Sequence, residues 1–355
     1  MASVHPALHE VKVQAEDRFH DRRVVRIENE KIRVSVTAEG GHIAELLDKE
    51  TGVNPLWVPP WPSIEVSSFI PGQPRYGNNC ESRLLAGIMG HSLCLDMFGP
   101  PSAEEQAAGL DSHGEAGVVE WSFRRRNDVL TAACMLPAAQ LRLERRIRLE
   151  ERSVIIRETV TNLSSLDRPI AWTQHVTLGP PFLEQGQTQF RASATRSQAL
   201  GSNHEFQWPL LPGPEGNRDL RVYTNEPCSG GYTAHLMNPQ LDDASFWAWS
   251  PRSGVLIGYI WKPGDFPWLG IWEENCSRTH APWQGRTLAR GMEFGVSPFP
   301  ETRRQMMERG RLFGTPCFRW LGAGKELVAE YYAAAGRAPA IPETLSEFAA
   351  ALELD

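Results

Sequence analysis

The sequence predicts a mainly β protein built of antiparallel strands, with short helices near the C-terminus. Between about residues 24 and 300, apolar and polar side chains alternate with a period of two far more often than with the helical period of 3.6. Gly, Pro, Asn and Asp punctuate these segments, as they do between antiparallel strands that have one packed and one solvated face. No motif recurs every 20–50 residues or so, which argues against propellers and solenoids.

Six alternating segments account for most of the expected strands. They lie at 32–36, 119–123, 141–149, 154–160, 255–261 and 288–296. Glu150 and Glu151 separate two of the long runs, so we expect a hairpin there. In the first of these two runs, 141–149, the side chains that alternate with the apolar ones carry charges of both signs. We therefore expect this face of the strand to be a solvated sheet surface. This face carries Arg142, Glu144, Arg146 and Arg148.

Helical periodicity is confined to the C-terminal part of the chain. Leu345, Phe348, Ala349 and Leu352 have the spacing of one helix face, and Pro342 lies where a helix begins. The run 326–335 is expected to be a second helix. With no low-complexity linker in the β region, we expect an N-terminal leader at 1–23, one domain at 24–335 and a helical extension at 336–355 packed on it.

Composition and charge exclude several classes of protein. The chain has 355 residues, a net charge of −7 and dispersed basic side chains, so a nucleic-acid partner is not expected. No apolar stretch is long enough to span a membrane and the N-terminus is polar, which predicts a cytoplasmic protein. We expect the protein to be a monomer or a homodimer. The six Cys are widely spaced without a C-x-x-C pair, so we expect free thiols, no metal site and no cofactor.

Two of the ten His stand at the ends of predicted strands beside long loops. His113 is in a turn that leads into the strand of Trp121, and His175 ends a strand that exits through a Gly-Pro-Pro turn. Rigid strand ends next to loops are typical positions for site residues. Six of the remaining histidines are expected in a turn or on the surface. His42 is the turn residue, and His5, His9, His20, His204 and His235 are the surface residues.

Glu293 is the strongest carboxylate candidate. Gly291 and Gly295 flank it on the same strand face and leave space for a ligand, while Met292 and Phe294 bury the opposite face. Partial desolvation would raise its pKa towards neutrality, as a general base requires. Glu273 and Glu274 are rivals, and periodicity alone does not choose among the three.

A cluster of tryptophans adds a third signal. Six of them fall within 40 residues: Trp247, Trp249, Trp261, Trp268, Trp272 and Trp283. Indole faces stack on the apolar face of a pyranose while polar groups bind its hydroxyls, so a Trp-rich β protein suits sugar recognition. Core packing explains at least half of them.

In four ordered segments the sequence resembles the galactose mutarotase-like superfamily, the aldose 1-epimerases and their relatives. These are GGHIAELLDKETGVNPLW at 40–57, His113-Gly114, VTNLSSLDRPIAWTQH at 160–175, and GMEFGVSPFP at 291–300. The resemblance implies a large antiparallel β-sandwich of supersandwich type, Glu293 as the catalytic carboxylate, and His113 and His175 as the two histidines of the site. It further implies a substrate-binding arginine, to which Arg83 and Arg75 are only loosely similar, and a substrate-binding aspartate that would be Asp242 or Asp243. Arg83, the two aspartates and Trp272 of the tryptophan cluster are the expected substrate-binding residues. The segment 91–101, with His91 and Asp96, departs from the family pattern.

The expected activity is therefore interconversion of the α and β anomers of a sugar by general acid and base catalysis. Glu293 would be the base, protonated His175 the acid, and His113 a hydrogen-bonding group, with no metal or nucleotide. One alternative is a non-catalytic carbohydrate-binding protein on the same fold. Another is a hexose-6-phosphate epimerase, which would use an Arg pair such as Arg22–Arg23 or Arg303–Arg304. Lyase or hydrolase chemistry is less favoured, because a glycosidase needs two carboxylates.

Overall fold

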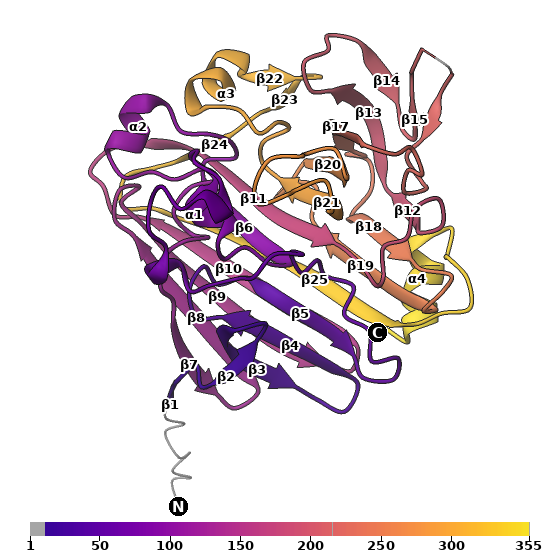
Figure 1. Ribbon diagram of the computed structural model, residues 1–355, viewed down its shortest axis with the longest axis horizontal. Helices are drawn as coiled ribbons and strands as arrows, with labels where there is room; N and C mark the ends of the chain where they lie inside the picture. The colour runs from indigo at the N-terminus through magenta and orange to yellow at the C-terminus, as the bar shows by residue number, and fades with distance from the viewer. Residues whose placement is uncertain (1–10, 215, 355) are drawn as a thin grey trace, which may run out of the picture.

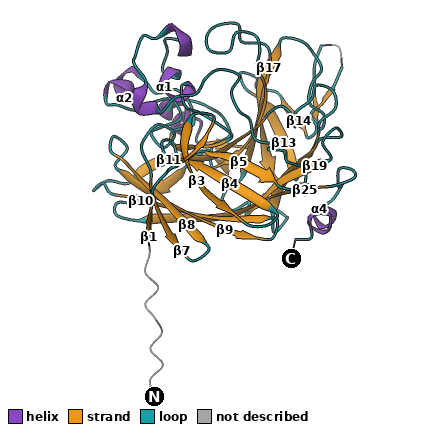
Figure 2. Cartoon of the chain, turned by 60° about the horizontal axis from the view of Figure 1, so that its bottom comes forward, coloured by secondary structure: helices purple, strands orange, loops and turns teal. Residues whose placement is uncertain are grey.

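Two large antiparallel β-sheets pack face to face in the computed structural model, which describes residues 11–214 and 216–354. The model thus confirms the predicted β-sandwich. Figures 1 and 2 show strands β3, β4 and β5 of one sheet lying over β7, β8 and β9 of the other, with the helices outside the sheets. The largest apolar cluster fills the space between the two layers and takes side chains from both sheets.

Within the described residues, the first sheet has nine strands. In spatial order they are β1 (Val11–Val13), β7 (Ser122–Arg126), β8 (Val129–Leu136), β9 (Leu141–Glu150), β10 (Ser153–Asn162), β25 (Glu326–Arg337), β19 (Val255–Trp261), β18 (Ala244–Trp249) and β12 (Gln189–Ala192).

The second sheet has twelve strands in the described part of the chain. Its spatial order is β14 (Glu205–Gln207), β13 (Ala194–Ala199), β17 (Ser229–Met237), β20 (Trp268–Asn275), β21 (Leu288–Gly295), β11 (Arg168–Leu178), β6 (His91–Asp96), β5 (Ile43–Asp48), β4 (Ile32–Thr37), β3 (Arg22–Glu28) and β2 (Asp17–Phe19), while β24 (Arg319–Leu321) pairs with β11.

The remaining elements are short. They are the two-stranded pairs β15 (Leu210–Leu211) with β16 (Arg218–Asp219) and β22 (Arg311–Leu312) with β23 (Thr315–Pro316), the 3-10 turns η1 (Val66–Ser68) and η2 (Pro74–Tyr76), and the helices α1 (Ser82–Leu85), α2 (Ala103–Ala107), α3 (Arg303–Arg309) and α4 (Leu345–Leu352). None of these helices is long and apolar enough to cross a bilayer.

The hairpin expected at Glu150 and Glu151 is present. Strands β9 and β10 pair antiparallel from Ser153 opposite Glu150 to Asn162 opposite Leu141. Along β9 the predicted charged face is exposed or half-buried, and the alternate residues are buried except for the half-buried Leu149. The period-two pattern therefore correctly identified which face of this strand is packed.

Both sheets join strands from distant parts of the chain. Strand β25 lies between β10 and β19, and β11 lies between β21 and β6. Since neither half of the chain completes a sheet alone, we propose that 24–335 is a single domain. Pairing of β11 with β21 also brings 168–178 beside 288–295, which positions the candidate site.

The run 326–335 is a strand, not the expected helix. Its Ala-rich composition favours a helix, but Ala329, Tyr331, Ala333 and Ala335 alternate inward, and the strand is hydrogen-bonded on both sides. Tertiary pairing thus overrides local propensity.

Three other details differ from expectation. The C-terminal helix exists, but Thr344 caps it through a capping box with Glu347, so it begins after Pro342. His235 is fully buried in β17, where it hydrogen-bonds Thr233 and Ser197, and is not on the surface. Residues 11–13 and 17–19 of the expected leader form edge strands β1 and β2, while His5 and His9 lie outside the described residues.

A buried ion pair lies between the sheets. Arg145 of β9 and Glu158 of β10 are fully buried, and the Nε of Arg145 donates to Glu158 at 2.6 Å. Glu158 also accepts hydrogen bonds from Trp172 at 3.0 Å and Gln174 at 2.6 Å, both on β11. One carboxylate thus connects the two sheets.

We expect Arg145→Met to lower the free energy of unfolding by about 3–5 kcal/mol, because it leaves the buried carboxylate of Glu158 without its counter-ion. The matched control is Arg146→Met, one residue along β9, where an exposed side chain pairs with Glu144 and its loss should cost about 1 kcal/mol or less. Urea unfolding followed by fluorescence measures both. Similar losses in the two variants would contradict a structural role for the buried pair.

Candidate active site

A small cavity lies on the outer face of the twelve-stranded sheet, on the side away from the inter-sheet core. Its volume is about 120 Å³, which suits a ligand smaller than the drug-sized molecules that fill sites of about 300–1,000 Å³. Residues of strands β11, β17, β20 and β21 form its floor, and residues of loops and of α1 form its walls. It is lined by Trp57, Glu81, Leu84, Leu85, Ile88, His113, His175, Thr177, Tyr232, Trp272, Arg278, Trp283, Glu293 and Pro300.

His175 and Glu293 are direct neighbours across the β11–β21 pair. The Nε2 of His175 and the Oε1 of Glu293 are 3.0 Å apart, and the Nδ1 of His175 is 3.1 Å from the hydroxyl of Thr177. Despite the short separation, Oε1 lies off the hydrogen-bonding direction of the ring nitrogen and has no hydrogen-bond partner among the described residues. Its capacity to bind a ligand oxygen is therefore retained.

Glycine at position 291 makes room for this arrangement. A Cβ built on Gly291 would overlap the Oε1 of Glu293, so the carboxyl group occupies the space that a side chain would fill. Trp272 lies opposite Gly291 on β20. The Gly-x-Glu pattern read from the sequence thus has the predicted steric meaning: glycine clears one face of the strand.

His113 reaches the cavity from a tightly held turn. Its backbone has a φ of 64°, in the left-handed region, and its N–H donates to the carbonyl of Gly99 at 3.0 Å. A Cβ on the following Gly114 would overlap the carbonyl of Leu95. The imidazole rings of His113 and His175 are 5.6 Å apart, so the structure brings both predicted histidines together. Non-glycine residues with such backbone angles concentrate at functional sites.

Aromatic rings and one arginine form a wall of the cavity. Trp272 and Trp283 pack edge to face at 5.8 Å, and the guanidinium group of Arg278 lies over both rings, at 5.4 and 4.7 Å. Glu274 accepts hydrogen bonds from the backbone N–H groups of Ser277 and Arg278 and so fixes this loop. Arg278 is further within 3.5 Å of Glu274, which offsets its charge.

Burial favours the neutral forms of the central groups. It lowers the pKa of His175 to about 3, with His113 adding to the effect, and it lowers the pKa of His113 to about 4, with Arg278 adding. Burial also raises the pKa of Glu293 well above its usual 4.5, against an opposing effect of Arg278. In the empty cavity burial therefore favours neutral His175 and a protonated Glu293 carboxyl, the opposite charge states from those expected from the sequence.

Buried polar atoms without a partner gather around this cavity. Among the described residues they include the Nδ1 of His113, the hydroxyl of Tyr232, the Nε1 of Trp283 and the Oε1 of Glu293. Buried polar groups are nearly always hydrogen-bonded, so several unpartnered atoms facing one space indicate a site for a polar ligand. A ligand with several hydroxyl groups meets this requirement.

Other predicted residues lie away from the cavity. Arg83 pairs with Asp111 at 2.8 Å beside a separate hollow. Asp242 and Asp243 lie in the turn before β18, and Asp243 pairs with Lys262. Neither they nor Arg75 lines the cavity. Of the six clustered tryptophans only Trp272 and Trp283 do.

The rival carboxylates and the arginine pairs also have other partners. Glu273 pairs with Arg218, and Glu274 holds the loop described above. The arginines considered for phosphate binding are engaged in ion pairs outside the cavity. Arg22 and Arg23 pair with Glu65, Arg303 with Asp96 and Glu105, and Arg304 with Glu308.

Sequence reasoning missed Tyr232, Arg278 and Trp57 as cavity residues. Tyr232 follows a Gly-Gly pair and Arg278 follows the strand of the two rival glutamates, so both stood near recognised signals. Trp57 closes the first segment of the family resemblance. Nothing in their local pattern indicated that these positions meet in space.

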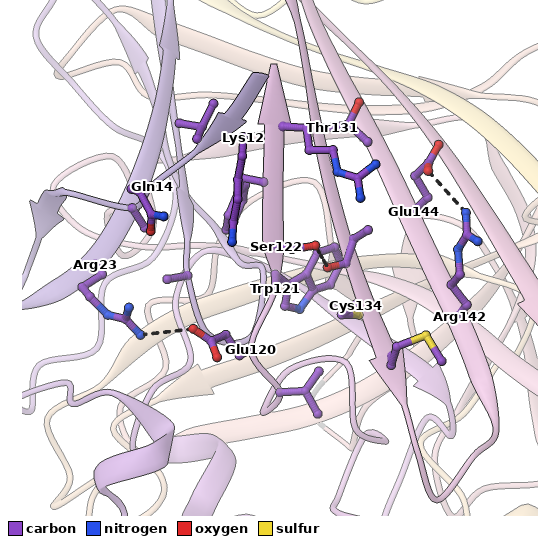
Figure 3. A pocket seen from close by; sticks show the side chains of 18 of the residues that line it. Lys12, Gln14, Arg23, Glu120, Trp121, Ser122, Thr131, Cys134, Arg142 and Glu144 are labelled. Carbon is purple, nitrogen blue, oxygen red and sulfur yellow. Dashed lines mark hydrogen bonds and ion pairs between the residues drawn. The ribbon is translucent and has the colours of Figure 1, made fainter. Parts of the chain in front are cut away.

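A larger hollow of about 840 Å³ is lined by residues of β1, β3, β7, β8 and β9 and of nearby loops (Figure 3). Of the residues considered for a site in the sequence analysis, it contains only Arg23, from one of the arginine pairs of the phosphate-binding alternative. Its charged side chains include the ion pairs Arg23–Glu120, at 3.9 Å, and Arg142–Glu144, at 3.6 Å. Size alone therefore does not make it the better candidate.

Solved structures of similar fold include proteins described as a putative aldose 1-epimerase and as galactose mutarotase-like. A "putative aldose 1-epimerase" of Klebsiella pneumoniae has a TM-score of 0.66 and 13% identity over 94% of this chain and 82% of its own. Galactose mutarotase-like proteins of Clostridium acetobutylicum and Lactobacillus casei have TM-scores of 0.62 and 0.59, with 13% and 16% identity, over 93% and 88% of this chain and 99% and 100% of theirs. No curated protein matches the sequence.

A family model described as a domain of unknown function, DUF4432, matches residues 123–310, which is more than half of the chain and includes both β11 and β21. The fold is that of the galactose mutarotase-like superfamily. The chain belongs to the DUF4432 family.

Proposed function

We propose that this protein is an aldose 1-epimerase that interconverts the α and β anomers of a sugar. The observation that carries the proposal is the contact of His175 with Glu293, at 3.0 Å, in a cavity shared with His113. The similar structures support the fold, and the names of those proteins agree with this chemistry.

Anomer interconversion needs one group that takes a proton and one that gives a proton. The ring opens when the anomeric hydroxyl loses its proton and the ring oxygen gains one, and it closes on the other face after rotation about C1–C2. Each assisted proton transfer typically contributes about 10²–10⁴-fold to the rate. Two adjacent titratable groups that share a single proton satisfy both needs.

His175 and Glu293 form such a pair. In the empty cavity burial places the shared proton on Glu293, and the sugar oxygens that enter the cavity supply the polar contacts that allow His175 to hold it instead. In that state Glu293 takes the anomeric proton and His175 donates to the ring oxygen. Microscopic reversibility returns both protons when the ring closes, so no metal or cofactor is part of the proposal.

The remaining lining residues bind and orient the sugar. His113 carries an unpartnered Nδ1 and contacts the substrate near the ring oxygen or the anomeric carbon. Trp272 offers an indole face to the apolar side of the ring, and Trp283 supplies an unpartnered N–H.

Replacement of either member of the pair tests the assignment. We expect Glu293→Gln and His175→Ala each to lower kcat for anomer interconversion about 10²–10⁴-fold, because each removes one proton transfer. Polarimetry or exchange NMR with a panel of aldoses measures the rate, and circular dichroism checks the fold. Glu273→Gln is the matched control: it is a buried glutamate of the neighbouring strand outside the cavity and should retain activity. Full activity in either site variant would contradict the assignment. Sugar binding by wild type without acceleration would instead favour a carbohydrate-binding protein.

The pH dependence follows from the shared proton. The pair is active with one proton: below about pH 3 His175 also becomes protonated and no base remains, and above the raised pKa of Glu293 the proton is lost and no acid remains. We therefore expect kcat/KM to be flat through pH 5 and to fall only at a pH well above 4.5. Initial rates from pH 4 to 10, corrected for spontaneous mutarotation, measure the profile. A rate that rises with pH through 4–5 would indicate an ordinary exposed carboxylate acting alone.

A further inference from the structure

Tyr232 differs from every other tyrosine in the chain. The sequence contains six, and the hydroxyls of the other five are hydrogen-bonded: Tyr76 to Pro62, Tyr223 to Glu274, Tyr259 to His91, Tyr331 to Glu158 and Gln174, and Tyr332 to Glu330. The hydroxyl of Tyr232 is buried and has no partner among the described residues. Buried phenol groups normally find one, so this exception requires an explanation.

The side chain of Tyr232 leans over a glycine on the next strand. Tyr232 of β17 lies opposite Trp272 of β20, and a Cβ built on Gly270, two residues before Trp272, would overlap the Tyr232 hydroxyl oxygen. Gly270 therefore leaves the space that the phenol occupies. Any side chain at this position would displace the hydroxyl.

Gly270, over which the Tyr232 hydroxyl lies, is next to the proposed proton-transfer pair of His175 and Glu293. Gly270 is the register partner of Glu293, and Glu293 is the register partner of His175. Paired residues in antiparallel strands have Cα atoms about 4.5–5.5 Å apart, so the phenol lies one strand away from the carboxyl group on the same face. Tyr232 lines the same cavity as both residues.

The ring of Tyr232 is held by apolar neighbours. Phe98 and Phe299 lie 6.1 and 6.2 Å from it between ring centroids, and the residue is only 9% exposed. A donor fixed in this way needs no reorganisation when charge develops beside it, and exclusion of water strengthens its hydrogen bond.

We propose that the Tyr232 hydroxyl donates a hydrogen bond to the ring oxygen of the sugar as that oxygen separates from C1. The inference rests on the proposed epimerase function and extends it by one catalytic residue. As the C1–O bond breaks, its electron pair passes to the ring oxygen while the anomeric O–H proton passes to Glu293 and the C1=O bond forms. His175 supplies the proton that the ring oxygen gains. Tyr232 keeps its own proton and stabilises the developing negative charge, so protons and electrons balance without a further reactant.

The phenol remains a donor over the whole working pH range. Burial and the nearby carboxyl of Glu293 raise the pKa of Tyr232 well above its usual 10. Other groups that face the cavity from adjacent elements are His113, Arg278 and Glu81. The alkaline fall in activity consequently belongs to the His175–Glu293 pair, not to Tyr232.

The test compares Tyr232→Phe with Tyr259→Phe. Both remove one buried hydroxyl, but Tyr259 lies between the sheets and contacts His91 outside the cavity. We expect Tyr232→Phe to lower kcat about 10²–10³-fold, the usual loss for one preorganised donor, with KM changed little and the pH profile unchanged in shape. Tyr259→Phe should lower the unfolding midpoint and leave kcat within a few-fold of wild type. Polarimetry on the best aldose of the panel gives kcat and KM separately.

Three results would overturn the proposal: unchanged kcat in Tyr232→Phe, a rise in KM alone, or an equal loss of kcat in both variants. Failure of the epimerase function itself looks different, because wild type then accelerates no aldose. If wild type binds a sugar without accelerating its interconversion, the epimerase function and the catalytic role of Tyr232 are both wrong, whatever affinity Tyr232→Phe shows. If wild type neither binds nor accelerates any aldose of the panel, both proposals are wrong.

Discussion

The geometry of the site depends on the hydrogen bonds that the buried carboxylate of Glu158 accepts. It is fully buried between the sheets and accepts hydrogen bonds from four side chains, those of Arg145, Trp172, Gln174 and Tyr331. A buried carboxylate is tolerated only when its charge and lone pairs are satisfied, and here the donors come from β9, β11 and β25. Because Trp172 and Gln174 both belong to β11, the network fixes the register and facing of this strand. His175, the next residue, must then point outward into the cavity.

Adjacent residues of one strand therefore serve opposite sides of the sheet. Gln174 contributes to the structure between the sheets and His175 to the chemistry outside them; in the same way Phe294 belongs to the core and Glu293 to the cavity. The cavity exists because the outward face of the sheet has no side chain at two positions. Gly270 and Gly291 on that face leave the space that the Tyr232 hydroxyl and the Glu293 carboxyl occupy. Glycine within a strand costs backbone entropy, about 0.5–1 kcal/mol relative to alanine, and at these two positions close approach requires it.

Period-two alternation was sufficient to predict the class of fold, the β9–β10 hairpin and the packed faces, because it reports directly which side of a strand is buried. Strand-end position made His113 and His175 candidates and flanking glycines made Glu293 one, but only the family resemblance selected Glu293 over Glu273 and Glu274. The failures have a different origin. Residues 326–335 have helical propensity, yet they form a strand because β10 and β19, which are distant in sequence, pair with them. Arg145 has the same side chain as its exposed neighbour Arg146, and only the contact of Arg145 with Glu158 distinguishes their roles. Tyr232 and Arg278 depend in the same way on which strands and loops come together, and local sequence carries no record of this.

The apolar walls of the cavity decide the protonation of the groups at its floor. Trp57, Leu84 and Ile88 bring no charge to the site, but they keep solvent from His175 and Glu293, and this burial is the largest cause of both pKa shifts. The same burial favours the neutral forms of both groups in the empty cavity. A hydrogen bond from a ligand then has a large effect on which of the two groups holds the proton, because no water competes with it. Under the proposed epimerase function, a sugar that supplies several oxygen atoms to this space would change the balance between the two forms of the pair by occupying it. Substrate binding and activation of the acid and base would then be one event, to which the apolar wall contributes by excluding water.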